Sequence, residues 1–304
     1  MEQNAQKILM ISPTRFGFNE EAFLTNTFQN RPTQHQNLIQ AQAKNEFDEF
    51  VKALRMLNVE VLVYEDLENS ETPDSIFPNN WFSTHQNSKL FTYPMAVSNR
   101  RRERRTDIIN DLKEKYQYKH IDLSSFESNT PPIFLEGTGS LILDHANKKA
   151  YAALSPRTNE TVLEQFAQEL NYTPITFTAL GKSREPIYHT NVMMCIGDNY
   201  AIIGLDTIIE NDRDRILDSL KSTGKEIIEF SNDLIYNHFG GNMLQIRNNQ
   251  NETILVMSQK AYSQLTEDQI KQLERLNDHL LPIEIPTIES VGGGSVRCML
   301  AELF

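Results

Sequence analysis

The sequence predicts an α/β fold, a five-bladed propeller or barrel in which ββα-type units are related by a pseudo-fivefold axis. Two observations predict it: a local pattern recurs at an almost constant interval, and strands at the two ends of the chain can pair with each other. The pattern is one or two small residues, then Ser or Asn, then an apolar strand, a turn and a second strand. Repetition of this kind is typical of architectures built from equal supersecondary units.

Four copies of the pattern are clear, and a fifth is looser. The clear copies are GTGSLIL, YHTNVMM, FGGNMLQ and GGGSVRC, anchored at Ser140, Asn191, Asn242 and Ser295. Successive anchors are 51, 51 and 53 residues apart. The looser copy, FPNNWFS, is anchored near Asn80 or Trp81 and leads into the apolar strand KLFTYPM. The even interval argues against an ordinary α/β sheet in which glycines merely mark turns.

Helical segments with apolar residues at spacings of three and four follow the copies. Thr158 or Asn159 can cap one helix, Thr266 and Gln269 form a capping box before another, and Gly224 suits a helix end. The helix containing Phe47 has no hairpin before it unless the C-terminal strand CMLAELF pairs with the N-terminal strand KILMIS. That pairing closes a ring and leaves no open sheet edge. We therefore expect a single catalytic domain over residues 1–304.

Composition excludes several classes of function. The 304 residues carry a net charge of −12, which disfavours nucleic acids and anionic membranes as partners. The apolar runs are too short to span a membrane, and the start MEQNAQK lacks the build of a signal peptide, so we expect a cytoplasmic protein. Two cysteines, Cys195 and Cys298, exclude a disulfide framework and a thiolate-rich zinc site. The histidines show no metal-ligand spacing, so no metal is expected.

The repeat register brings three reactive side chains together. Glu136, His189 and Cys298 each lie within four residues of an anchor, so a pseudo-fivefold axis points them toward one cavity. An imidazolium promotes deprotonation of a thiol, and the same ring can protonate a leaving amine or activate water. Each residue also has a structural interpretation, and Cys195 in VMMCIG is best interpreted as a small core residue. The three glycines before Cys298 favour a functional role there, because they allow close backbone approach to a ligand and conformations closed to other residues.

These motifs, spread over nearly the whole chain, resemble the guanidino-group modifying enzymes, or penteins. The motifs that carry the resemblance are FGFNEE, TPDSIFPNNWFSTH, RRRERR, FLEGTGSLI, LSPRTN, HTNVM and GGGSVRCM. PDSIFPNNW and FLEGTGS are most similar to the arginine deiminase-related citrulline-utilisation hydrolases. The family includes dimethylargininases and amidinotransferases, and one member of this fold only binds partners.

The resemblance implies a cofactor-independent hydrolase that cleaves C–N bonds of a ureido or guanidino group in a small amino-acid substrate. Cys298 is then the nucleophile, His189 the general acid and base, and Glu136 the residue that orients the imidazole and substrate nitrogens. The matching positions that bind substrate are Asp74, the substrate-carboxylate ligand Arg157, and one arginine of 100–105, with Arg101 preferred. That basic run can equally be a solvated stretch paired with Glu103 and Asp107. Amidino transfer, dimethylargininase-like activity and a catalytically silent binding protein remain alternatives, and the sequence leaves a homo-oligomer open.

Departures from the family pattern bear on the substrate. Asn79 and Asn80 stand where dimethylargininases carry two acidic residues, and Asn191 replaces an aspartate often found two residues after the histidine. Amides can donate to a ureido oxygen and accept from its nitrogens, so a neutral ureido group is favoured over a guanidinium. The long polar segment 13–40 predicts a flap over the site, with Phe16 and Phe18 as lid candidates.

Overall fold

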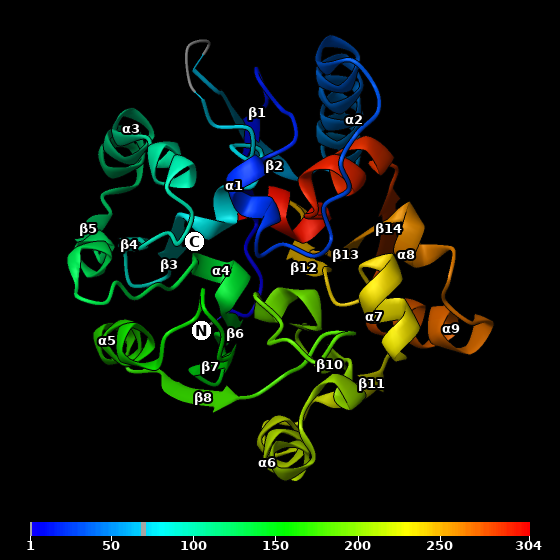
Figure 1. Ribbon diagram of the computed structural model, residues 1–304. Coiled ribbons are helices and arrows are strands. Elements are labelled where there is room, and N and C mark those ends of the chain that lie inside the picture. Colours follow the sequence, from blue (N-terminus) through cyan, green and yellow to red (C-terminus); the bar gives the residue numbers. More distant parts are fainter. Residues whose placement is uncertain (1, 68–70) are drawn as a thin grey trace.

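The protein forms a ring of five small sheets. The computed structural model describes residues 2–67 and 71–304, and in these ranges fifteen strands form five three-stranded sheets. The sheets surround a common centre, with the long helices on the outside (Figure 1). The prediction of a five-unit α/β propeller is confirmed.

The five sheets share one topology. Their strands are β3 Phe82–His85, β4 Lys89–Thr92 and β5 Lys119–Asp122; β6 Ile142–Asp144, β7 Lys149–Ala153 and β8 Thr173–Phe177; β9 Met194–Ile196, β10 Tyr200–Ile203 and β11 Glu226–Glu229; β12 Leu244–Arg247, β13 Thr253–Ser258 and β14 His279–Ile283; and β15 Ala301–Leu303, β1 Lys7–Ser12 and β2 Glu60–Glu65. The first two strands of each sheet pair antiparallel, and the third pairs parallel with the second.

A helix connects the second strand of each sheet to the third, so the unit is ββαβ. These helices are α2 Gln36–Met56, α3 Thr106–Tyr116, α5 Glu160–Leu170, α6 Glu210–Lys221 and α9 Glu267–Leu276. The sequence pattern predicted only ββα because the third strands are outermost and weakly apolar. In β8, for example, Thr173 and Pro174 are exposed and only Phe177 is buried.

The two ends of the chain close the ring as expected. Strand β15 pairs antiparallel with β1, with Lys7 opposite Leu303 and Leu9 opposite Ala301. Strand β2 occupies the other edge of β1. The first strand of the chain therefore has both edges covered, which satisfies its backbone groups and removes a site for pairing with other chains.

The helix boundaries follow the predicted caps. Asn159 caps α5 by accepting a hydrogen bond from the amide of Thr161, and Thr266 and Gln269 form the expected capping box of α9. Gly224 adopts a positive φ of 76° in the turn after α6. The helix α2 buries Phe47, Phe50 and Leu54 against the sheets, in accord with the spacing of its apolar residues.

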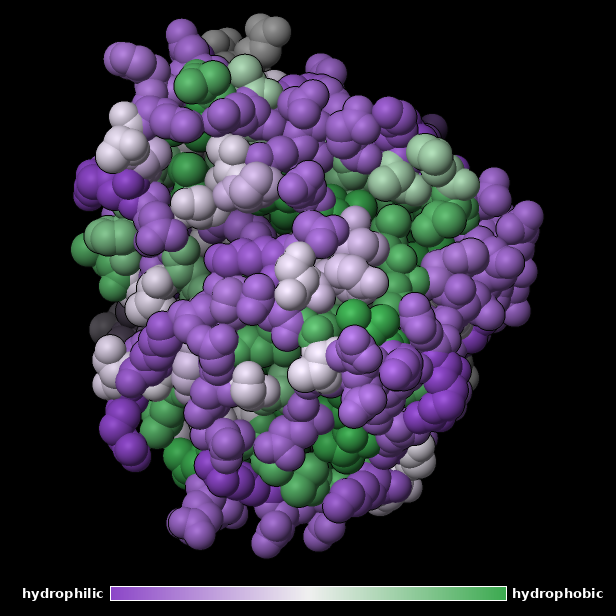
Figure 2. Space-filling model, turned by 90° about the vertical axis from the view of Figure 1, so that its right-hand side faces the viewer, coloured by the Kyte–Doolittle hydropathy of each residue, from purple (hydrophilic) through white to green (hydrophobic). Residues whose placement is uncertain are grey.

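The face beside α9 and β14 is largely hydrophilic, with smaller hydrophobic areas between the polar side chains (Figure 2). Such a surface suits the strongly acidic composition of the chain. No helix within residues 2–67 and 71–304 is both long and apolar enough to cross a membrane.

Candidate active site

Short helical turns before the first strands gather the predicted site residues near the centre of the ring. They include η1 Pro78–Asn80, α4 Gly137–Ser140, η4 Thr190–Val192 and η7 Val296–Met299. The turn α4 contacts both η1 and η4, and η1 contacts η7. Because Glu136 and His189 cap α4 and η4, and Cys298 lies in η7, residues far apart in sequence meet here.

Two glycines of the GTGS motif allow the turns to pack this closely. A Cβ on Gly137, whose φ is +47°, would lie 2.3 Å from the carbonyl oxygen of Asn79. A Cβ on Gly139 would lie 2.3 Å from Nδ2 of Asn80 and 2.9 Å from Nδ1 of His189. Both distances are too short for a side chain, so the glycines are required for the approach of η1 and of the imidazole to α4.

The glycines before Cys298 also allow close packing, but against protein groups. Side chains at Gly292 or Gly294 would collide with the ring of Phe77, at 2.8 Å and 2.9 Å respectively. Gly293 has a positive φ of 65°, and its Cβ would lie 2.7 Å from the backbone nitrogen of Gln29. The sequence analysis expected these glycines to approach a ligand; instead they let the chain before η7 pack against Phe77 and against Gln29 of the N-terminal segment.

A buried carboxylate, Glu136, orients the imidazole of His189. The ring donates from Nε2 to Oε2 of Glu136 over 2.7 Å, and both side chains are buried. Oε1 of Glu136 accepts from the backbone amide of Ala96 at 2.9 Å, and Nη1 of Arg157 lies 3.4 Å from Oε2. With its proton on Nε2, the neutral ring presents Nδ1 as a base toward the space beside Asn80 and Gly139.

The protonation states of this pair follow from burial and charge. Burial lowers the pKa of His189 to about 4; Glu136 opposes this shift, and the cations of Arg157 and Arg100 add to it. Burial acts to raise the pKa of Glu136, but Arg157 and the hydrogen bond from His189 more than offset it and hold this pKa far below its usual range. At neutral pH the pair is therefore a neutral imidazole on an ionised carboxylate.

The sulfur of Cys298 lies against two asparagine amides. Nδ2 of Asn191 is 3.4 Å from Sγ, and Nδ2 of Asn242 is 3.3 Å from it. The residue therefore lies against η4, the turn that His189 caps, without a direct hydrogen bond to that ring among the described residues. The other cysteine, Cys195, lies in β9 within the apolar core, where burial raises its thiol pKa to about 12.

Beside Glu136 lies a second buried cluster, centred on Arg100. Its guanidinium makes a two-pronged contact with Glu103 at 2.9 Å and donates to Oδ1 of Asn80 at 2.8 Å. Its Nε is 3.8 Å from Oδ2 of Asp74, which also accepts from Asn19 at 2.7 Å. Burial raises the pKa of Asp74 despite the opposing charge of Arg100, and it raises the pKa of Glu103 to about 7.

Among the arginines of 100–105, the structure directs the preferred Arg101 away from this cluster. Its Nε donates to the carbonyl of Met95 at 2.9 Å and lies 3.5 Å from Glu127. Arg100 takes the expected place instead, because the 3₁₀ turn Asn99–Glu103 (η2) points it inward. The alternative expectation for residues 100–105 was a basic stretch paired with Glu103 and Asp107. It describes Arg105, which pairs with Asp107.

The segment between β1 and α2, residues 13–35, contacts this cluster. Figure 1 shows the segment, which includes α1 (Glu20–Phe23), passing across the centre of the ring. Nη2 of Arg157 donates to Oγ1 of Thr25 and lies 3.4 Å from the carbonyl of Ala22. Asn26 donates to the carbonyls of Gly292 and Gly293 at 3.4 Å and 3.3 Å. The contacts of this segment with the cluster therefore come from residues that the sequence analysis did not single out; that the segment acts as a flap stays a prediction.

The two lid candidates lie elsewhere in this segment. Phe16 is fully buried and belongs to the same core cluster as Phe77. Phe18 is half-buried and packs against Phe23, with their ring centroids 5.0 Å apart. Their packing anchors the segment, whereas Asn19 and Thr25 face the buried charges.

Several buried polar atoms around the cluster have no hydrogen-bond partner among the described residues. They are Oδ1 of Asp74, both side-chain polar atoms of Asn79, Nδ2 of Asn80, Nε of Arg157 and Oδ1 of Asn191. Unpartnered buried polar atoms are rare in folded proteins and costly. Their concentration at this one place indicates a site for a polar ligand with both donors and acceptors.

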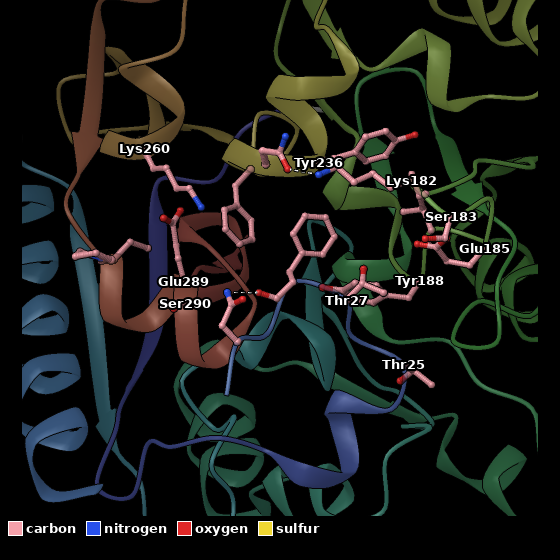
Figure 3. A pocket seen from close by; sticks show the side chains of 18 of the residues that line it. Thr25, Thr27, Lys182, Ser183, Glu185, Tyr188, Tyr236, Lys260, Glu289 and Ser290 are labelled. Carbon is pink, nitrogen blue, oxygen red and sulfur yellow. Dashed lines mark hydrogen bonds between the residues drawn. The ribbon is translucent and has the colours of Figure 1, made fainter. Parts of the chain in front are cut away.

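A cavity that Tyr188 helps to line adjoins the cluster. It encloses about 760 Å³ and is lined by the 25–30 part of the covering segment, the 181–188 loop, and residues near α7 Asn232–His238 and α8 Gln259–Tyr262. Figure 3 shows Lys260 and Glu289 together on one wall and Lys182 and Glu185 on another. Tyr188 is shared by cavity and cluster, since the Arg157 guanidinium lies 5.0 Å from its ring.

Residues 12–304 match the family model described as N,N dimethylarginine dimethylhydrolase, eukaryotic. The search of the curated proteins found no match.

Three solved structures illustrate the similarity in fold. The N-terminal domain of ArgZ, an arginine dihydrolase from Cyanobacteria, has a TM-score of 0.73 at 13% identity, over 97% of each chain. AgrE bound to L-arginine has a TM-score of 0.76 at 13% identity, over 98% of this chain and 40% of that one. DDAH from Pseudomonas aeruginosa in complex with citrulline has a TM-score of 0.69 at 15% identity, over 99% and 100% of the two chains. These likenesses establish the fold.

The lowered pKa of His189 predicts how stability depends on pH. The unfolded chain takes up the histidine proton near pH 6.5 and the folded chain only near pH 4, so the unfolded state binds more protons between these values. His189 therefore reduces the free energy of unfolding as the pH falls through this window. Glu103 acts in the opposite direction, because its raised pKa makes its contribution disappear as the pH rises toward 7.

The variant His189→Gln isolates the contribution of this histidine to the pH dependence of the free energy of unfolding. Between pH 7 and pH 5 the wild type should lose about 2 kcal/mol more than the variant in urea unfolding. NMR of the histidine rings provides the direct check, with the His189 signal identified by its absence from the variant. Titration of that signal near pH 6.5 would contradict the lowered pKa of His189.

Proposed function

Because this chain belongs to the N,N dimethylarginine dimethylhydrolase family, we propose that it hydrolyses the ureido or guanidino group of a citrulline- or arginine-like amino acid through a covalent adduct on Cys298. The observation that carries the proposal is the set of unpartnered buried polar atoms next to the His189–Glu136 pair. A binding protein would gain nothing from an oriented imidazole and a thiol facing the same turn.

The chemistry requires few groups. The Cys298 sulfur adds to the central carbon of the ureido group, and the C–N bond to the side-chain amine breaks. His189 donates a proton from Nδ1 to that amine, and the proton that Cys298 released to solvent on ionising balances this step. Water then cleaves the S–C bond and regenerates the thiol, so that citrulline and water give ornithine, ammonia and carbon dioxide. With a guanidinium substrate, the first round releases ammonia and leaves a ureido product.

The balance of donors and acceptors supports a ureido group. A guanidinium offers only N–H donors, whereas Nδ2 of Asn79, Nδ2 of Asn80 and Nε of Arg157 are themselves unpartnered donors within the described chain. A ureido oxygen would supply the acceptor that these donors lack, and the free oxygen of Asp74 would accept from its nitrogens. Ornithine is then the expected end product from citrulline, and from any arginine that enters.

Arg157 has a different role in this proposal from the one that the resemblance implied. The resemblance implied that it binds the substrate carboxylate, whereas its guanidinium is buried between Glu136, Thr25 and the Tyr188 ring. We propose that it keeps Glu136 ionised and that its unpartnered Nε faces the substrate.

Substrate choice is tested by incubating the protein with citrulline, arginine, agmatine and dimethylarginine and measuring ammonia, citrulline and ornithine. We expect ornithine from citrulline. Asn80→Asp exchanges the unpartnered donor for an acceptor and should lower kcat/KM for citrulline by roughly tenfold or more, with a smaller effect on arginine. Turnover of arginine with no turnover of citrulline would contradict the argument from the asparagines.

The assignment of the nucleophile is tested with the two cysteine variants. Cys298→Ser should abolish turnover and labelling by iodoacetamide, because the reactive sulfur is removed. Cys195→Ser is the matched control; it should retain both, since Cys195 is a core residue with a raised pKa. Retained turnover in Cys298→Ser would overturn the assignment.

A further inference from the structure

We propose that Asn242 is a further catalytic residue, whose side-chain amide donates a hydrogen bond to the sulfur of Cys298 and stabilises it as a thiolate. This inference rests on the proposed function, in which Cys298 is the nucleophile. It assigns a chemical role to a repeat anchor that the sequence analysis identified only as a marker of the fold.

The surroundings of Asn242 fix the orientation of its amide. Oδ1 accepts from the backbone amide of Arg297 at 3.1 Å, a group that can only donate. Nδ2 donates to the backbone carbonyl of Asn191 at 3.2 Å, a group that can only accept. Exchange of oxygen and nitrogen would break both bonds, so the second N–H of Nδ2 must face the sulfur, 3.3 Å away.

A glycine brings this amide to the sulfur. A Cβ on Gly241 would lie 2.4 Å from the carbonyl oxygen of Val192 and 2.6 Å from the carbonyl carbon of Met193. Only glycine therefore allows the loop before β12 to pack directly on η4, the turn that contains Asn191. The FGGN sequence of the fourth unit is thus tied to the position of Asn242 beside Cys298.

A second amide acts at the same atom. Nδ2 of Asn191 lies 3.4 Å from the sulfur, and Asn191 and Asn242 occupy equivalent positions 51 residues apart in neighbouring units. Two N–H groups therefore converge on one sulfur, and both asparagines are at least 98% buried. Hydrogen bonds to an ionised partner in a desolvated place are stronger than those between neutral groups.

The ionisable groups near the sulfur do not supply a positive charge that is directed at it. The imidazole of His189 is turned toward Glu136 and is neutral at pH 7. The phenol of Tyr188 is also neutral, because burial raises its pKa. The guanidinium of Arg297 contacts Glu302 and the carbonyl of Leu300, and that of Arg157 contacts Glu136 and Thr25.

The contacts with Asn191 and Asn242 stabilise the neutral thiol less than they stabilise the thiolate. Its S–H can donate to Oδ1 of Asn242 over 3.7 Å, a long and weak hydrogen bond. The thiolate accepts from two N–H donors instead, and this difference favours ionisation. Once ionised, the sulfur can attack while His189 remains available for the proton that the leaving amine requires.

The test measures the rate at which iodoacetamide alkylates Cys298 as a function of pH, in the Cys195→Ser background, where Cys298 is the only thiol. Asn242→Asp keeps the shape of the side chain but replaces the N–H donor by an acceptor. It should slow alkylation at pH 7 roughly tenfold or more and move the pH midpoint up by about one unit or more. Asn242→Ala should shift the midpoint in the same direction.

Two further variants separate this role from a structural one. Asn277→Ala removes another buried asparagine, one bonded to Tyr200 and Gln245, and should leave the alkylation midpoint unchanged even if it lowers stability. His189→Gln should abolish turnover and also leave the midpoint in place. A rise in the midpoint with His189→Gln, or no rise with a folded Asn242→Asp, would overturn the proposal.

The outcomes also distinguish this proposal from the proposed function. A midpoint that depends on Asn242, together with no turnover of any ureido or guanidino compound, would contradict only the substrate assignment. Turnover that survives in Asn242→Asp with an unchanged midpoint would contradict only the role of Asn242. If the Asn242 variants do not fold, the midpoint in His189→Gln decides, because a thiolate held by the imidazole would lose its stabilisation there.

Discussion

The buried carboxylate of Glu136 is the contact on which the arrangement of the site depends. It accepts hydrogen bonds from the Ala96 amide and the His189 ring and pairs with the Arg157 guanidinium. It thereby joins three units of the ring, and it fixes which nitrogen of His189 carries the proton. Removing one partner of a buried charge is strongly destabilising. Both the stability of the fold and the orientation of His189 therefore depend on the partners of Glu136.

The five-unit architecture could be predicted from the sequence because the same few residue types recur at equivalent positions of the units. Glycine and a small polar anchor recur wherever a turn packs near the axis, and collisions of a Cβ at Gly137, Gly139 and Gly241 with neighbouring turns explain why. The third strand of each unit was not predicted, because it lies at the outer edge and carries a weak apolar signal. Ring closure was predicted because each end of the chain contains an apolar strand.

Details of the site depended on geometry that no local pattern records. The run of arginines at 100–105 gives no sign of which member points inward, and the pitch of the 3₁₀ turn selects Arg100. Asn19 and Thr25 cover the charges only because the 13–35 segment folds across the ring. The sequence also suggested an imidazolium beside the thiol, whereas burial and two nearby arginines keep His189 neutral. That difference assigns ionisation of the sulfur to the asparagine anchors.

In the proposed mechanism, Cys298 forms a covalent adduct with the substrate carbon during hydrolysis. It is tested most directly by quenching the protein with acid during turnover of citrulline and analysing its peptides by mass spectrometry. We expect an adduct on the peptide that contains Cys298 and none on the peptide that contains Cys195. The adduct should disappear once the substrate is exhausted. Turnover without any adduct, or with modification of Cys195 alone, would contradict it.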